Sequence, residues 1–224
     1  MKKNLNFYIT LWIVKLISAG LKLLGKNATY YPGKLALDMC PGFMGMLDKP
    51  KTIIGVTGTN GKTTVSNMIN DILIDNGYKI INNKYGSNID AGIATTLLQG
   101  ATLFGKSKKE IAVLEIDERS APKVFPYITP TYLICTNIFR DSLMRNAHTE
   151  FISEIVSKNV PKDTIVIENA DDLICSGIAP NNAKIYFSID KLDTDTKEPH
   201  NIVRDIITCP VCNTKLEYEY YRYH

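Results

Sequence analysis

The chain has 224 residues, of which 45% are hydrophobic and 22% are charged, and its formal net charge is +3. This ordinary globular composition excludes disorder, collagen and low-complexity architectures. The charge balance gives no footprint for nucleic-acid binding, and five cysteines are too few for a disulfide scaffold. We therefore expect a cytoplasmic α/β protein, whose length fits one large domain or two small ones.

The first predicted element is an amphipathic helix over residues 5–24, with Lys2 and Lys3 ahead of it. Lys15 and Lys22 interrupt its apolar run on one helical stripe, whereas a signal peptide or a membrane span needs a more continuous apolar stretch. The first interpretation is a helix packed on its own domain. The second is a helix lying on the inner membrane surface with its lysines toward the lipid headgroups. A membrane span is the third.

The rest of the chain alternates between two kinds of apolar pattern. Residues 25–51 are rich in glycine and proline and predict a loop with one short helical piece. Strands are predicted at 52–56, 78–81, 111–116, 132–136, 164–167 and 184–187. Helices are predicted at 63–76, at 91–104 and near 150–156. This rhythm predicts a mostly parallel sheet covered by helices on both faces, as in P-loop NTPases.

A glycine-rich loop between the first strand and the next helix carries the strongest chemical motif. Its glycines let backbone N–H groups converge on phosphate oxygens, and the helix dipole favours the same anion. Lys62 would reach the β- and γ-phosphates, and the Thr63 hydroxyl would ligate Mg²⁺. The strict pattern has glycine where Val56 stands, so a turn without a ligand is the alternative. The candidate nucleotide-binding residues are Thr57, Gly58, Thr59, Asn60, Gly61, Lys62, Thr63 and Thr64.

The loop resembles that of the Mur ligases and their folylpolyglutamate synthase relatives, G-x-T-G-T-N-G-K-T-T. From about residue 50 onward the chain resembles this superfamily. More narrowly, it resembles the MurT family, the Mur-ligase-like subunits of lipid II isoglutaminyl synthase. Six segments in the order of that family carry the narrower resemblance: Tyr31-Pro32-Gly33-Lys34, Asn83-Lys84-Tyr85-Gly86-Ser87-Asn88, Leu114-Glu115-Ile116-Asp117-Glu118, Thr136-Asn137-Ile138-Phe139-Arg140-Asp141, Asn169-Ala170-Asp171-Asp172 and Cys209-Pro210-Val211-Cys212.

Acidic residues at the end of strand 111–116 would stand beside the phosphate loop, where a carboxylate can hold Mg²⁺ or its waters. The resemblance implies that Lys62 and Glu115 are catalytic, and that Glu115 organises Mg²⁺. Asp117 and Glu118 are weaker candidates, with a solvated strand end as the alternative. The resemblance also implies that Asn137 contacts the adenine of ATP, although the residue alone is typical of a helix cap.

Two departures from the Mur ligase pattern concern a second metal. Many of these ligases continue the Asn137 segment with a histidine that contacts the second metal, and here Ser142 follows Asp141. They also use a carbamylated lysine, and Lys158 is one position out of register with it. We assign no second-metal ligand.

Cys209 and Cys212 form a Cys-x-x-Cys pair, which suits either half of a Zn²⁺ site or redox chemistry. Residues 215–223 alternate as a hairpin strand would, and the MurT family carries a zinc ribbon at this place. A second cysteine pair is expected about 15–20 residues further on. We therefore expect the sequence to end inside the ribbon, with His224 as a less favoured third ligand. The other cysteines are expected to be buried hydrophobic side chains, namely Cys40, Cys135 and Cys175.

The expected organisation is an N-terminal helix and linker (1–48), a central ATP-binding domain (49–207) and a partial zinc ribbon (208–224), without the C-terminal ligase domain. The resemblance implies ATP-dependent amidation of the D-glutamate α-carboxylate in the lipid II stem peptide through an acyl phosphate. It also implies a GatD-type glutaminase partner that supplies ammonia, and a substrate at the inner membrane face. We expect this chain alone to be inactive. The alternatives are another carboxylate–amine ligase of the folylpolyglutamate type and a non-catalytic nucleotide-binding module.

Overall fold

The computed structural model describes the whole chain except residues 27, 85–86, 140–148, 199–206, 210–211 and 222–224. At its centre is a six-stranded sheet with the strand order β2-β3-β1-β4-β5-β6, in which every neighbouring pair is parallel. The strands are β1 (Thr52–Thr57), β2 (Ile80–Asn82), β3 (Ile111–Glu115), β4 (Tyr132–Cys135), β5 (Ile165–Asn169) and β6 (Lys184–Phe187). The predicted parallel sheet is confirmed.

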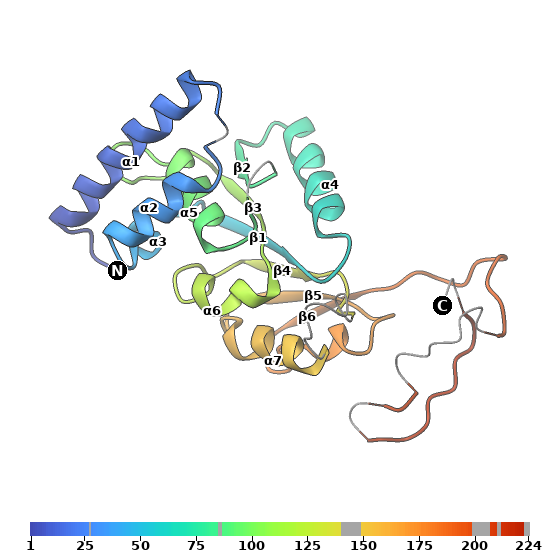
Figure 1. Cartoon of the computed structure of the whole chain (residues 1–224). Coiled ribbons are helices and arrows are strands. Elements are labelled where there is room, and N and C mark those ends of the chain that lie inside the picture. Colours follow the sequence, from blue (N-terminus) through green and yellow to red (C-terminus); the bar gives the residue numbers. More distant parts are fainter. Residues whose placement is uncertain (27, 85–86, 140–148, 199–206, 210–211, 222–224) are drawn as a thin grey trace.

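Helices cover both faces of the sheet, as the alternating pattern predicts (Figure 1). The connection from β1 to β2 runs toward one sheet edge, whereas the later connections run back toward the other. Right-handed crossovers therefore place α4 on the opposite face from the helices that follow it. The helices between the strands are α4 (Lys62–Asp75), α5 (Asp90–Gly100), α6 (Ala121–Val124) and α7 (Thr149–Asn159). Two short 3₁₀ turns are η1 (Glu118–Ser120) and η2 (Cys175–Gly177).

The segment ahead of β1 is more helical than its composition predicts. It forms α1 (Leu5–Leu23), α2 (Tyr31–Met39) and α3 (Phe43–Met46), where we expected one helix and a mainly irregular linker. Pro32 stands in the first turn of α2, where a missing N–H is tolerated. A Cβ on Gly33 would lie 1.9 Å from the Ala91 carbonyl oxygen in α5, so only glycine permits this close helix contact. The Tyr31-Pro32-Gly33-Lys34 segment is thus a packing motif between α2 and α5.

One continuous hydrophobic core joins the N-terminal helices to the sheet, and Cys40, Cys135 and Cys175 are buried in it as expected. Beyond β6 the described residues extend away from the sheet (Figure 1). The predicted strand is not formed in its described part, 215–221, which pairs only through the single bridges Thr196–Tyr221 and Thr208–Lys215. With one bridge to each partner segment, this part has too few backbone hydrogen bonds for a strand.

Candidate nucleotide-binding site

The carboxyl ends of three strands meet at one edge of the sheet, because β1 pairs in parallel with β3 on one side and with β4 on the other. The candidate residues from Thr57 to Thr64 form the end of β1, the following loop and the first turn of α4. Glu115 ends β3, and Asn137 follows β4. The fold therefore brings the candidate ATP and Mg²⁺ residues together, at the edge where open α/β sheets bind their ligands.

Two glycines set the path of the loop. Gly58 has φ +124°, and a Cβ there would lie 2.2 Å from Thr136 Oγ1, so both the backbone conformation and the available space require glycine. Gly61 has φ +80° and caps α4, and among the described residues no heavy atom beyond Gly61 and its chain neighbours lies within 4 Å of the place where its Cβ would be. Val56, which replaces the glycine of the strict pattern, is fully buried within β1. The loop thus turns after β1 and leaves open space at Gly61.

The loop is bonded to the chain that follows β4. The Thr59 N–H donates to the Asn137 carbonyl oxygen over 2.8 Å. The Asn60 N–H donates to Asn137 Oδ1 (2.9 Å), while Asn137 Nδ2 donates back to the Asn60 carbonyl oxygen (3.0 Å). Thr136 Oγ1 donates to the same carbonyl over 2.7 Å. Asn137 therefore supports the loop backbone, and its contact with adenine stays a prediction.

The N-terminus of α4 faces the open side of the loop. It has no side-chain cap, and the first N–H that is bonded within the helix is that of Val65. The N–H groups ahead of it are those that bind anions at helix N-termini. Thr63 and Thr64 lie exposed in this first turn.

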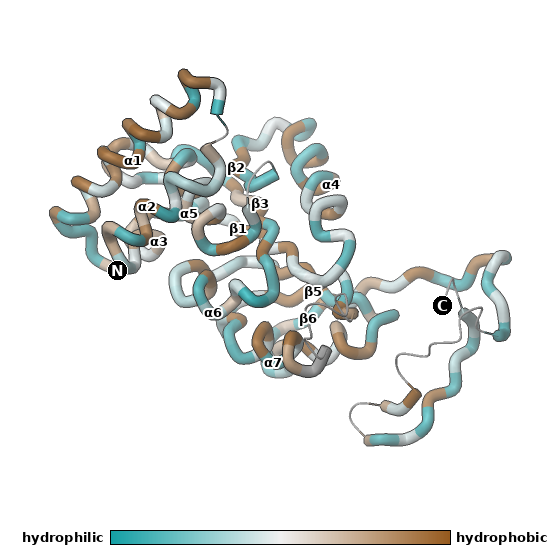
Figure 2. Tube along the Cα trace, viewed as in Figure 1, coloured by the Kyte–Doolittle hydropathy of each residue, from teal (hydrophilic) through white to brown (hydrophobic). Residues whose placement is uncertain are grey.

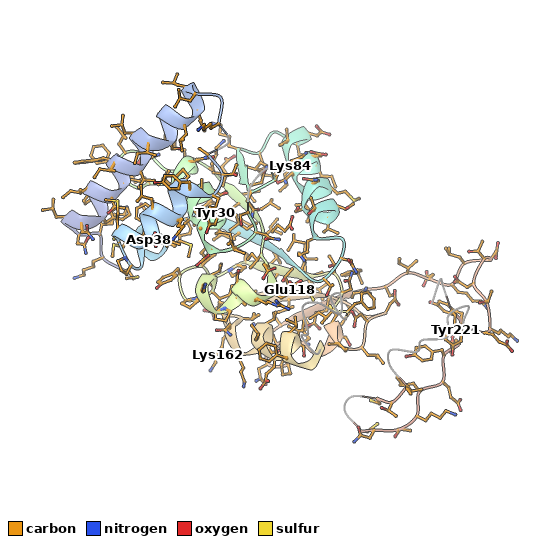
Figure 3. The ribbon with its side chains drawn as sticks, in the orientation of Figure 1. Tyr30, Asp38, Lys84, Glu118, Lys162 and Tyr221 are labelled. Atoms are coloured by element: carbon orange, nitrogen blue, oxygen red, sulfur yellow. The ribbon has the colours of Figure 1, made fainter. Side chains whose placement is uncertain are left out.

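Lys62 extends from this helix end into a small polar cluster. Its Nζ donates to the carbonyl oxygens of Gly58 and Thr59 and forms an ion pair of 3.1 Å with Glu118 Oε1. Glu118 lies near the centre of the molecule in Figure 3, and its side chain is only 11% exposed. Burial raises the pKa of the Glu118 carboxyl, and the charge of Lys62 opposes that rise. Glu118 is a weaker candidate than Glu115 by sequence, but in the structure Glu118 forms the ion pair with Lys62 of the loop.

Glu115 is held by four hydrogen bonds from three residues. Thr63 Oγ1 donates to Glu115 Oε2 over 2.8 Å, and Asn88 Nδ2 donates to Glu115 Oε1 over 3.1 Å. Asn83 bonds the backbone of Glu115 in both directions, through its Nδ2 (2.8 Å) and its Oδ1 (2.9 Å). The predicted Mg²⁺ residues Thr63 and Glu115 are therefore in direct contact. Tyr85 and Gly86, between the two asparagines, lie outside the described residues.

Two further residues position the loop after β4, and we did not single them out as site residues. Asn169 Nδ2 donates to the Thr136 carbonyl oxygen over 2.9 Å. The buried Asp172 accepts the N–H of Ile138 over 2.6 Å. Both belong to the Asn169–Asp172 segment, which is one of the six segments that carry the family resemblance. That resemblance is the sequence feature from which their role could have been predicted. Asp141 and Ser142, the second-metal positions, lie outside the described residues, and Lys158 pairs with Glu154 in α7.

The two cysteines of the predicted zinc ribbon lie in one turn of the C-terminal segment. The Cys209 N–H donates to the Thr214 carbonyl oxygen, and Cys212 Sγ lies 3.3 Å from Thr214 Oγ1. Among the described residues, no three His, Cys, Asp or Glu side chains gather as metal ligands. This turn offers two of the four ligands that structural zinc requires, so zinc stays a prediction. Pro210, Val211 and His224 lie outside the described residues.

The raised pKa of Glu118 predicts a pH-dependent stability. Because burial raises the pKa above its ordinary value of 4.5, the folded state retains this proton to higher pH than the unfolded chain does. The stabilisation from this group is complete below the unfolded pKa and is lost as the pH rises through the folded pKa. We expect the stability of Glu118→Gln, relative to the unsubstituted chain, to rise as the pH increases above the ordinary value of 4.5.

Urea unfolding at several pH values measures this difference. The exposed Glu217 provides the control variant Glu217→Gln, whose relative stability should vary less over the same range. A relative stability of Glu118→Gln that stays constant, or falls as the pH rises, would contradict the assignment.

Comparison with known proteins agrees with this geometry. The Mur ligase middle domain, as a family model, matches residues 56–207. The lipid II isoglutaminyl synthase (glutamine-hydrolyzing) subunit MurT of Staphylococcus aureus (strain COL) is 30% identical over 215 residues, covering 95% of this chain and 48% of the relative. The MurT subunit of Streptococcus pneumoniae (strain ATCC BAA-255 / R6) is 35% identical over 207 residues, covering 91% and 45%. The chain spans about half the length of the curated relatives it matches.

Solved structures show the same fold. MurF from Acinetobacter baumannii superposes with a TM-score of 0.54 at 21% identity, covering 69% of this chain and 35% of that one. Escherichia coli FolC in complex with DHPP and ADP gives a TM-score of 0.51 at 15% identity, covering 68% and 47%. The family model covers most of this chain, including the loop, β3 and β4. The chain therefore belongs to the Mur ligase family and has the fold of its middle domain.

Proposed function

We propose that this chain provides the ATP-binding part of a carboxylate–amine ligase of peptidoglycan synthesis. The reaction that we propose is amidation of the D-glutamate α-carboxylate in the lipid II stem peptide. One observation carries the proposal. At one edge of the sheet, the glycine-rich loop and the N-terminus of α4, which has no side-chain cap, lie beside Lys62 and the hydrogen-bonded pair Thr63–Glu115. The finer reaction is supported by the sequence similarity to two MurT subunits.

The described residues fit Mg·ATP. The space at Gly61 and the N–H groups of the first turn of α4 suit phosphate oxygens. The Thr63 hydroxyl and the Glu115 carboxylate, 2.8 Å apart, are oxygen donors of the kind that Mg²⁺ prefers. When bound, Mg·ATP supplies the phosphoryl group and neutralises part of its charge.

The residues of this chain would act by positioning and by charge. Lys62 would exchange Glu118 for phosphate oxygens and hold the nucleotide in line with the acceptor carboxylate. In the proposed reaction, a carboxylate oxygen attacks the γ-phosphorus, which gives an acyl phosphate and ADP. Ammonia then attacks the acyl carbon, phosphate leaves, and the amide loses a proton. A partner glutaminase of the GatD type would supply the ammonia, in keeping with the printed description of the relatives as subunits of a glutamine-hydrolyzing synthase.

Nucleotide binding is testable on the full chain. We expect Mg·ATP at a hundredfold excess over its Kd to stabilise the folded state by about 2.7 kcal/mol, which raises the melting temperature by roughly 5–10 °C. Lys62→Ala should abolish most of this rise, because it removes the cation that faces the phosphates. The exposed Lys162, labelled in Figure 3, provides the matched control Lys162→Ala, which should keep the full rise. An equal rise in both variants would refute the site.

The amidation itself is testable in cells of the source organism. The chromosomal gene would carry Lys62→Ala or Lys162→Ala while an inducible copy of the unsubstituted gene is shut off. Mass spectrometry of the stem peptides distinguishes the α-amide from the free α-carboxylate of D-glutamate. We expect the free acid to accumulate only with Lys62→Ala. Unchanged amidation in a strain whose Lys62→Ala protein has lost ATP binding would rule out the proposed reaction and leave the nucleotide site intact.

A further inference from the structure

α1 lies flat on the domain and has two opposite apolar faces. Phe7, Leu11 and Val14 form the inner face and are fully buried in the core. On the outer face, Leu5, Ile9, Trp12 and Leu16 follow the spacing i, i+4, i+7 and i+11. Side chains at this spacing lie along one side of a helix, so they form a single stripe that faces the solvent. The exposed residues of this outer stripe are Leu5, Ile9, Trp12, Ile13, Leu16 and Leu23. Figure 2 shows the apolar residues of α1 as brown segments along the helix.

The loop after α5 extends the outer stripe. Leu103 and Phe104 are 59% and 65% exposed at the tip of this loop. Trp12 Nε1 donates to the Leu103 carbonyl oxygen over 2.8 Å, and Lys3 Nζ donates to that of Phe104 over 3.3 Å. A shallow hollow lined by Trp12, Lys15, Leu16 and Leu103 lies between the two elements. Two separate segments therefore present one apolar surface, which we name the α1 face.

The sequence around the α1 face is basic. Residues 1–37 contain six lysines and no aspartate or glutamate, and residues 91–109 contain three lysines and again no acidic residue. Lys2, Lys22, Lys106 and Lys108 are exposed. The pKa of Lys15 is lowered first by burial and then by the charges of Lys108 and Lys22, one from each of these two segments.

The structure corrects one detail of the second sequence interpretation. Lys15 does not point toward solvent, because its Nζ donates to the carbonyl oxygens of Leu98 (2.8 Å) and Ala101 (2.7 Å). It thereby satisfies carbonyl groups at the C-terminus of α5, where a cation is favourable. Lys3 is likewise paired with Asp48. The positive charge available to a ligand therefore comes from the exposed lysines around the stripe.

We propose that the α1 face docks on the surface of an anionic phospholipid bilayer, with α1 parallel to the membrane. Exposed apolar side chains that include a tryptophan suit the boundary between headgroups and acyl chains, and the surrounding lysines suit anionic headgroups. A second copy of the chain fits less well, because two such faces would bring lysines against lysines. The inference rests on this surface alone and holds whatever reaction the chain catalyses.

A membrane span does not suit the same helix in this fold. Among the described helices, α1 has the length and mean hydropathy of a candidate span, with a value of 1.2 over its best window. Its inner face is nevertheless part of the core, where Phe7 packs against Phe43 with ring centroids 5.3 Å apart. Insertion across a bilayer would remove these contacts, whereas parallel docking keeps them.

The test uses the full chain and its single tryptophan, Trp12, as a reporter on the α1 face itself. The chain is mixed with vesicles of phosphatidylcholine alone or of phosphatidylcholine with phosphatidylglycerol, and binding is followed by sedimentation and by Trp fluorescence. We expect binding and a blue shift with the anionic vesicles, and weaker binding at high salt. Leu16→Glu should weaken binding about tenfold or more, since it places a charge in the apolar stripe.

Matched controls separate this face from the rest of the molecule. Ile72→Glu places the same charge on another exposed apolar residue, in α4 (60% exposed, against 76% for Leu16), and should leave vesicle binding unchanged. Circular dichroism of each variant confirms that the fold is retained. The proposal is overturned if anionic vesicles give neither sedimentation nor a blue shift, or if both variants lose binding equally. It is also overturned if alkaline carbonate fails to release the chain, which would indicate a span, or if Leu16→Glu abolishes a dimer instead.

Discussion

The parallel pairing of β1 with β3 on one side and β4 on the other is the constraint on which the candidate site depends. The loop after β1 is bonded to Thr136 and Asn137 beyond β4, and Thr63 is bonded to Glu115 at the end of β3. A shift of one residue in either register would turn the facing side chains to the other side of the sheet. The buried strands thus place three separate pieces of chain within hydrogen-bond distance of one another.

Within this frame, the groups suited to a nucleotide are bonded to each other. Lys62 is neutralised by Glu118, and the carboxylate of Glu115 accepts hydrogen bonds from Thr63 and Asn88. A buried charge without a partner is costly, so the ion pair between Lys62 and Glu118 stabilises the fold of the site. Nucleotide binding would replace Glu118 by phosphate oxygens at Lys62, and Mg²⁺ would take the place of the hydrogen bond between the Thr63 hydroxyl and Glu115. Binding of Mg·ATP would therefore exchange the partners of Lys62, Thr63 and Glu115.

Much of this architecture could be predicted from the sequence, because strand and helix patterns and the loop glycines are local signals. What could not be predicted depends on tertiary contacts. Residues 31–46 include α2 and α3 although their composition is typical of a loop, and Gly33 of α2 packs closely on α5. Lys15 turns inward to carbonyl groups more than 80 positions away, which no helical stripe reveals. Two further contacts also join segments far apart in the sequence. Glu118 of the 3₁₀ turn η1 forms an ion pair with Lys62, and Asn137 donates a hydrogen bond to the Asn60 carbonyl oxygen.

The most direct test of the central claim is the Mg²⁺ dependence of ATP binding by Glu115→Gln, measured by isothermal titration calorimetry with and without Mg²⁺. Glutamine keeps the size of the side chain but removes the charge that faces the cation. We predict that Mg²⁺ strengthens ATP binding by the unsubstituted chain and does so far less for Glu115→Gln, while binding without Mg²⁺ stays the same. An equal effect of Mg²⁺ on both proteins would contradict the account.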